Sequence, residues 1–174
     1  LQPVRNPDGR DAIQRTTAWG FDPNRDFGTW NQAENRLFVP QMNTYPGVFF
    51  IDAHQTSSGY FFPPNEDPVH HEISHFALDF IQHGIGPALQ DAFNAQSIAF
   101  RNYSQYDLFT PEYGDTVPAL IMGAAGMTFE KGTSEAYAKQ VYDHYLAIDT
   151  TIKATVQDKT AVTTGWVEQW AEAV

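Results

Sequence analysis

The chain has 174 residues, of which 42% are hydrophobic and 18% are charged, and its formal net charge is −11. This length and hydrophobic content predict one globular domain with a core and exclude a disordered tail. With only 10 Lys and Arg residues, the chain lacks the clustered positive charge that binding to nucleic acid or to an anionic membrane face requires. Cysteine is absent, which excludes disulfides and thiolate ligands, and no apolar run approaches the ~18 residues of a membrane span.

The first fifty residues are rich in turns and contain few regular elements. Residues 2–5 are expected to end a strand, and the NPDG stretch, Asn6–Gly9, is expected to form a turn. Residues 10–33 show no periodicity, whereas residues 33–42 are predicted to form a short helix. A mostly apolar run with aromatic and β-branched residues then predicts a buried strand over Gly47–His54.

The middle of the chain begins with a long loop and continues into helices. The segment DPVHHEISHFALDFIQHG is predicted to be helical, because Pro68 stands at its start and Gly84 at its end. A second helix is expected over Pro87–Gln96. Two short buried strands are expected at 116–123 and 126–131, with a glycine-rich turn between them.

The last predicted element is a long helix over residues 133–158. Its apolar residues recur at helical spacing: Ala136, Val141, Tyr145, Ile148 and Ile152. Strands mixed with helices of this length predict an α/β fold, in which a mixed sheet is flanked by helices.

One motif in the first long helix matches H-E-x-x-H, in which two His bind zinc and the Glu acts as general base. It consists of His71, Glu72 and His75. At 100° per residue, the apolar stripe that contains Ile73 and Phe76 lies on the side of the helix opposite to both His. The helix phase therefore favours a solvated His pair, and a zincin-type metalloprotease is the alternative hypothesis.

The stretch GFDPNRDFG begins like a calcium-binding EF-hand loop, with Asp22, Asn24 and Asp26 in the D-x-N-x-D pattern. Such a loop needs Gly at its sixth position and Glu at its twelfth. Those positions hold Phe27 and Ala33, so a calcium loop is excluded.

Five residues spread along the chain suit the recognition and hydrolysis of a peptide. Arg25 and the adjacent Asn24 form a natural clamp for a carboxylate, since the guanidinium fork binds both oxygens and the amide adds a donor. Arg15 lies ten residues earlier, and His54 ends the predicted strand as a candidate metal ligand. Glu130 lies on another apolar strand, where a carboxylate is poorly solvated and therefore suited to general-base work.

Together the stretches NPDG, GFDPNRDF, DAHQ and GMTFEKG resemble the second half of the zinc carboxypeptidase family. The resemblance runs from Asn6 to about Gly132, and the separation of His54 and Glu130 is similar to that between the family's last zinc ligand and its catalytic Glu. It implies that residues 1–174 form a single partial domain, the C-terminal half of a carboxypeptidase-like α/β/α domain. The stretch YFFPPNEDPVHHEIS resembles bacterial members, which implies a secreted bacterial enzyme.

The resemblance also implies a role for each candidate residue. Asn24 and Arg25 would bind the C-terminal carboxylate of a peptide or protein substrate. Arg15 would stabilise the oxyanion, His54 would be the third zinc ligand, and Glu130 would take the proton from the attacking water and pass it to the leaving amine. The family's mobile Tyr would be one of two residues, Tyr113 or Tyr106.

The sequence departs from the family at its first two zinc ligands, which form an H-x-x-E motif upstream of NPDG. None of the six His residues has Glu three positions later. We therefore expect a fragment that holds one of three zinc ligands and is inactive alone. Because the missing strands would leave a sheet edge and an apolar face uncovered, it should associate with the missing N-terminal half, associate with itself, or be marginally stable. A third hypothesis is a binding module for peptide C-termini that does no catalysis.

Overall fold

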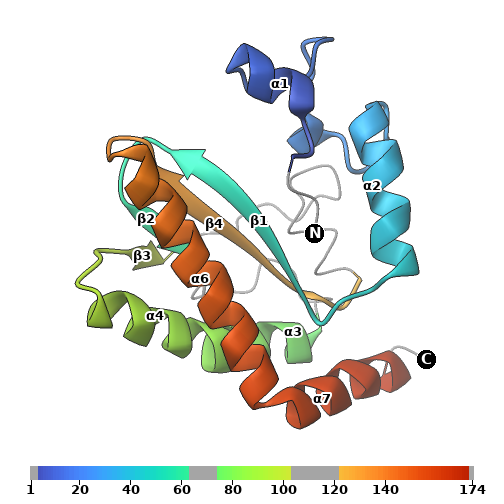
Figure 1. Cartoon of the computed structure of the whole chain (residues 1–174). Helices are drawn as coiled ribbons and strands as arrows, with labels where there is room; N and C mark the ends of the chain where they lie inside the picture. Colours follow the sequence, from blue (N-terminus) through green and yellow to red (C-terminus); the bar gives the residue numbers. More distant parts are fainter. Residues whose placement is uncertain (1–3, 63–73, 103–121, 173–174) are drawn as a thin grey trace.

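A mixed β-sheet forms the centre of the molecule (Figure 1). The structure is a computed structural model and describes residues 4–62, 74–102 and 122–172. Within these residues one sheet has the order β1-β4-β2-β3, and its strands are β1 (Phe49–Thr56), β2 (Tyr60–Phe62), β3 (Arg101–Asn102) and β4 (Ala125–Gly132). β1 and β4 run parallel along their full lengths, β2 is antiparallel to β4, and β3 is parallel to β2. The prediction of a mixed α/β sheet flanked by helices is thus confirmed.

Helices lie around this sheet. Their bounds are α1 (Pro7–Ala12), the 3₁₀ turn η1 (Pro23–Arg25), α2 (Ala33–Thr44), α3 (His75–Asp79), the π-helical turn η2 (Phe80–Ile85), α4 (Gly86–Ala95), α6 (Tyr137–Gln157) and α7 (Lys159–Glu172). The predicted helix over 33–42, the strands over 47–54 and 126–131, and the long helix over 133–158 are confirmed as α2, β1, β4 and α6, with ends shifted by a few residues.

Gly84 does not end a helix, contrary to the prediction. The chain continues without a break from α3 through η2 into α4. A Cβ atom on Gly84 would lie 2.8 Å from the ring of Phe80, so the glycine makes room for an aromatic side chain one turn earlier. Close packing, rather than helix termination, explains this glycine.

The N-terminal predictions also need correction. Val4 and Arg5 are not in a strand, and the NPDG stretch is the beginning of α1 rather than a free turn. The side chain of Asn6 caps this helix by accepting from the backbone N–H of Gly9 at 3.0 Å, and Pro7 occupies the first helical turn, where proline is tolerated. The strands β2 and β3 and the helix α7 were not predicted. Of the strand predicted over 116–123, residues 116–121 lie outside the described residues, and residues 122 and 123 lie in a turn.

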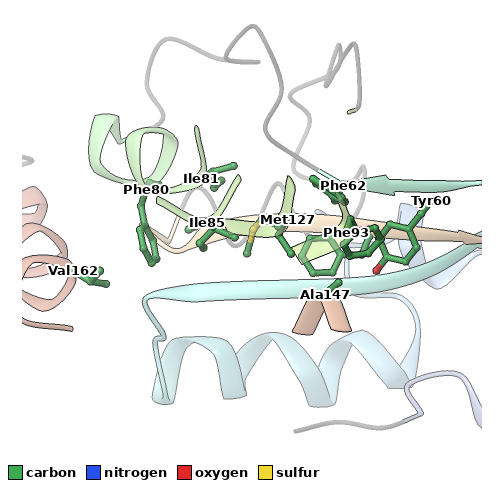
Figure 2. Packing of buried hydrophobic residues seen from close by; sticks show 13 residues of the cluster. Tyr60, Phe62, Phe80, Ile81, Ile85, Phe93, Met127, Ala147 and Val162 are labelled. Atoms are coloured by element: carbon green, nitrogen blue, oxygen red, sulfur yellow. The ribbon is translucent and has the colours of Figure 1, made fainter. Parts of the chain in front are cut away.

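The two faces of β4 carry different side chains. Met127, Phe129 and Lys131 are buried on the face that α6 covers. This side holds the main core, in which the ring of Phe93 lies 4.8 Å from Tyr60 and 5.2 Å from Phe62, centroid to centroid (Figure 2). The buried members of this core are Tyr60, Phe62, Ala77, Phe80, Ile81, Ile85, Leu89, Phe93, Ala125, Met127, Phe129, Ala147 and Val162.

A buried charge network joins β4 to α6. The ammonium of Lys131, only 2% exposed, lies 2.8 Å from the carboxylate of Asp143, which is fully buried. Lys139 donates to both oxygens of Asp143 at 2.6 Å, and Glu135 pairs with Lys131. Buried charges need such partners because each one loses its hydration.

A second, smaller cluster lies in the N-terminal part of the chain. It consists of Phe27, Phe38 and Val39, and Phe50 of β1 packs against it. The guanidinium of Arg5 lies 5.0 Å above the ring of Phe27 and 5.1 Å above that of Phe38, a cation–π arrangement. This cluster attaches α2 to the sheet.

The apolar stripe of α6 points away from the core. Val141 is 50% exposed, Tyr145 is 60% exposed and Ile152 is 45% exposed. An amphipathic helix normally buries its apolar stripe, so α6 is unusual in exposing these apolar side chains to solvent. Across the described parts of the chain, no helix combines the length and apolar character needed to cross a bilayer.

Candidate functional site

The candidate site lies near the carboxyl ends of β1 and β4. His54 stands opposite Glu130 in the parallel register, and Asp52 stands opposite Thr128. Because side chains alternate between faces, these four residues share the face opposite to the buried Phe129. The carboxyl ends of parallel strands are where α/β sheets bind ligands.

The turn that carries Asn24 and Arg25 is fixed by two aspartates. Asp22 caps it, with its Oδ1 accepting from the backbone N–H of Asn24 at 2.9 Å. Asp26 is buried and accepts from the backbone N–H groups of Asn31 at 2.8 Å and Gln32 at 2.7 Å. The two acidic residues that resemble calcium ligands in the sequence are therefore used to hold the turn.

This turn also contacts α2. The amide Nδ2 of Asn35 donates to the carbonyl of Pro23 at 2.7 Å and lies 3.3 Å from Asp26. Asn35 is fully buried, so the amide is held in a fixed environment. The position of the Asn24–Arg25 pair is thus set by α2.

Asn24 reaches the end of β1. Its Nδ2 lies 3.1 Å from Nε2 of His54, and the same Nε2 lies 2.6 Å from Oδ2 of Asp52. The ring nitrogen either accepts from Asn24 or, when it carries the proton, donates to Asp52. The Oδ1 of Asn24 is buried and has no hydrogen-bond partner among the described residues.

The charges around His54 favour its protonated form. Burial lowers the pKa of the imidazole, but the hydrogen bond with Asp52 and the negative charges of Asp52 and Glu130 outweigh that effect, so the pKa is raised above its ordinary value. The positive charge of Arg15 opposes this increase. Glu130 and Arg15 are therefore both close enough to act on the ring.

The NPDG motif positions Arg15. Nδ2 of Asn6 donates to the carbonyl of Arg15 at 3.2 Å, and Nε of Arg15 donates to Asp22 at 2.6 Å. A Cβ atom on Gly9 would lie 2.2 Å from the side chain of Asn6, so only glycine leaves this cap in place. The motif thus acts on the site through the backbone of Arg15.

The backbone of His54 is held from the other face of the sheet. Nε2 of His144 on α6 lies 3.1 Å from the carbonyl of His54, and Nδ1 lies 3.0 Å from the hydroxyl of Tyr60. Burial lowers the pKa of His144 and raises that of Tyr60. A neutral His144 with its proton on Nε2 satisfies both contacts, since it donates to His54 and accepts from Tyr60.

A closed metal site is not formed by the described residues. Imidazole and carboxylate donors are ligands that zinc accepts, and His54, Asp52 and Glu130 supply that chemistry. Yet within residues 4–62, 74–102 and 122–172 no group of three His, Cys, Asp or Glu is arranged to hold a metal ion. These residues supply at most part of a ligand set.

The structure brings most of the predicted residues into one continuous cluster. Arg15 contacts Asp22, Asp22 contacts Asn24, Asn24 contacts His54, and Glu130 stands beside His54 on β4. Other predicted site residues, Tyr106, Tyr113, His71 and Glu72, lie outside the described residues. His75 is exposed at the first residue of α3.

Sequence reasoning missed the partners of these side chains. Asp22 entered only as the first position of the excluded calcium loop, and neither Asp52 nor His144 was assigned a role. The D-x-H spacing of Asp52 and His54 is a usable signal, because alternate strand residues share a face. Nothing in the local sequence around His144 indicates its contact with β1.

An open hollow of about 430 Å³ lies elsewhere, where α3 and η2 meet the junction of α6 and α7. Its lining includes Phe76, Phe80 and Val162, with Asp79 and Asp158 at its polar parts. None of the residues of the candidate site line it.

The fold is similar to that of solved carboxypeptidase structures. A metallo-carboxypeptidase from Burkholderia cenocepacia is 16% identical, with a TM-score of 0.66 and coverage of 89% of this chain and 43% of its own. A "putative carboxypeptidase A" from Shewanella denitrificans is 19% identical, with a TM-score of 0.64 and coverage of 88% and 45%. No protein-family model matches this sequence, and comparison with curated proteins gives no match either. The chain therefore has a carboxypeptidase-like α/β fold and spans less than half the length of either protein.

Proposed function

We propose that this chain supplies the carboxylate-binding and proton-transfer part of a metallocarboxypeptidase that releases the C-terminal residue of a peptide. The observation that carries the proposal is the contact between Nδ2 of Asn24 and Nε2 of His54, with Glu130 beside His54 on the next strand. This contact joins the candidate carboxylate clamp to the candidate metal ligand and general base in one place. The carboxypeptidase-like fold supports the same assignment.

Substrate recognition falls to Arg25 and Asn24. The guanidinium of Arg25 is exposed, and its Nη1 donates to the carbonyl of Asn24 at 2.7 Å, which directs the fork along the turn. A substrate carboxylate accepts from this fork and from the Asn24 amide. An internal peptide bond carries no such charge and leaves the clamp without its partner.

The reaction is a hydrolysis. Glu130 takes a proton from the attacking water as the water oxygen bonds to the scissile carbonyl carbon. As the carbon–nitrogen bond breaks, the same proton passes to the leaving amine. Asp22 engages one of the five N–H donors of the Arg15 guanidinium. In the proposed reaction, Arg15 uses its other donors to stabilise the negative charge that develops on the carbonyl oxygen.

A metal would polarise the scissile carbonyl and activate the attacking water. His54 would be the zinc ligand that the described residues contribute, and further ligands would be needed to complete the site. Among the described strands β1 pairs only with β4.

Arg25→Gln is expected to weaken binding of a peptide with a free C-terminus by about 10- to 100-fold, because a charge-assisted pair contributes roughly 1.5–3 kcal/mol. Isothermal titration of an N-acetylated dipeptide and of its C-terminal amide into the chain measures this. Arg10→Gln, on the exposed surface of α1, is the matched control and should leave affinity unchanged. Equal binding of the acid and the amide by the unchanged chain would contradict the proposal.

Zinc is expected to bind this chain weakly, because one imidazole with nearby carboxylates makes an incomplete site. His54→Ala should abolish that binding, and His71→Ala should leave it unchanged. Equilibrium dialysis with a zinc indicator distinguishes the two. Tight binding that His71→Ala removes would instead support the zincin-type alternative with His71, Glu72 and His75.

A further inference from the structure

The hollow of about 430 Å³ lies among helices, where α3, η2 and α4 meet the junction of α6 and α7. The side chain of Gln169 on α7 donates to the carbonyl of Gly123, just before β4, at 2.9 Å. The hollow is thus at the opposite end of the sheet from the carboxyl ends of β1 and β4, which carry the candidate site (Figure 1). Its volume falls within the range of small-molecule sites, roughly 300–1,000 Å³.

Two stacked aromatic rings form the main apolar surface of the hollow. The ring centroids of Phe76 and Phe80 are 5.9 Å apart, and the interplanar angle is 15°. Each ring packs closely against a glycine. A Cβ atom on Gly165 of α7 would lie 2.6 Å from the ring of Phe76, and one on Gly84 would lie 2.8 Å from that of Phe80. This close packing fixes both rings, so the apolar surface is formed before a ligand binds.

Small side chains on three helices leave the space beside these rings. Ala88 of α4, Ala154 of α6 and Ala161 of α7 all line the hollow. A methyl group at each of these positions does not reach across to the opposite wall, whereas a larger side chain would occupy the hollow. The sequence of all three helices therefore keeps this space open.

The polar part of the hollow is acidic. Its titratable residues are Asp79, His83 and Asp158, and neither lysine nor arginine is among the residues that line it. Nδ1 of His83 lies 3.1 Å from Oδ1 of Asp79 and so engages part of that carboxylate. The carboxylate of Asp158 has no ion-pair partner in the part of the chain that the structure describes. The hollow thus presents a free negative charge beside an aromatic surface.

We infer that this hollow binds a small organic cation that joins an ammonium group to an apolar body. The ammonium pairs with the carboxylate of Asp158, and the apolar body packs against the rings of Phe76 and Phe80. An anion of the same shape would lie beside like charge and is rejected. A cation without an apolar body leaves the rings in contact with water and gains only a solvent-screened ion pair. The inference does not rest on the proposed peptidase activity.

The probe is phenylbutylammonium, and its two controls are phenylbutyrate, which keeps the body and reverses the charge, and butylammonium, which keeps the charge and lacks the ring. Titration of the probe into the isotope-labelled chain should shift the amide resonances of Gly84 and Val162 along a saturating curve. We expect the probe to bind about tenfold more tightly than either control. Equal affinity for the probe and phenylbutyrate, or shifts confined to residues outside the hollow, would overturn the inference.

Substitutions then test the two parts of the site separately. Asp158→Asn should weaken binding of phenylbutylammonium by about tenfold, because it removes the counter-charge. Asp91→Asn, which removes an exposed carboxylate of α4 outside the hollow, is the matched control and should leave affinity unchanged. Ala161→Leu should weaken binding without a change of charge, because the larger side chain fills the hollow. All three side chains are exposed, so circular dichroism should show unchanged folding. Unchanged affinity after Asp158→Asn would overturn the inference.

Discussion

Asp143→Asn is expected to lower the free energy of unfolding by about 3–5 kcal/mol, because it leaves the buried ammonium of Lys131 without its nearest fully buried counter-charge. The carboxylate of Asp143 is wholly buried, lies 2.8 Å from the ammonium of Lys131, and accepts from Lys139 at 2.6 Å. Glu135 also pairs with Lys131, but its side chain is 43% exposed. Because water screens its charge, Glu135 stabilises the buried ammonium of Lys131 less than Asp143 does. Urea denaturation followed by circular dichroism measures the change.

Two comparisons test the physical reason. Asp149→Asn breaks a pair on the same helix whose Lys is mostly exposed, and it should change stability far less. Replacing both members of the buried pair, as in Lys131→Met with Asp143→Leu, should recover part of the loss since no unpaired charge remains. A double variant less stable than Asp143→Asn would contradict this explanation.

Asp26→Ala is expected to destabilise the chain by about 2–3 kcal/mol and to reduce its sensitivity to acid. Asp26 accepts from Thr29, Asn31 and Gln32 at 2.7–2.8 Å, and its loss frees the turn that carries Asn24 and Arg25. Peptide binding should therefore weaken together with stability. Asp11→Ala, an exposed carboxylate on α1, is the matched control.

The pH dependence follows from the direction of the pKa shift. Burial raises the pKa of Asp26, but the hydrogen bonds from Gln32, Thr29, Asn31 and Asn35 outweigh it, so the folded-state pKa lies below the ordinary value of 3.8. The unfolded state therefore takes up the proton first, and the contribution of Asp26 is fully present above about pH 4. It is lost as the pH falls through the folded pKa. Denaturation between pH 2 and 5 should show a shallower slope for Asp26→Ala, and an identical slope would contradict this assignment.

The sequence predicts the parts of the fold that local rules govern. α2, β1, β4 and α6 were found from periodicity and β-branched content, which are properties of the segments themselves. The strands β2 and β3 were missed because each is very short and is defined by its pairing with distant residues, such as Tyr60 with Lys131. The prediction for Gly84 was wrong because the ring of Phe80 determines the role of this glycine, whereas the sequence rules for helix ends take no account of packing.

The candidate site was predicted as a set of residue types but not as a geometry. Arg15, Asn24, Arg25, His54 and Glu130 were all selected from the sequence. Their connections depend on long-range pairing, since His54 and Glu130 become neighbours only through the parallel register of β1 and β4. The supporting contacts of Asn6 with Arg15 and of His144 with His54 are likewise tertiary, and no spacing rule predicts them.

The separation of the hydrophobic residues into two clusters has a consequence for the native-state ensemble. The cluster of Phe27, Phe38 and Val39 is small, and it meets the sheet mainly through Phe50. Regions with few buried apolar contacts open locally at a lower free energy than the main core. We therefore expect amide hydrogens of residues 4–44 to exchange through sub-global openings that leave β4 and α6 protected. On this expectation Asn24 and Arg25 lie in the part of the molecule that opens first, whereas His54 and Glu130 lie in the part that opens last.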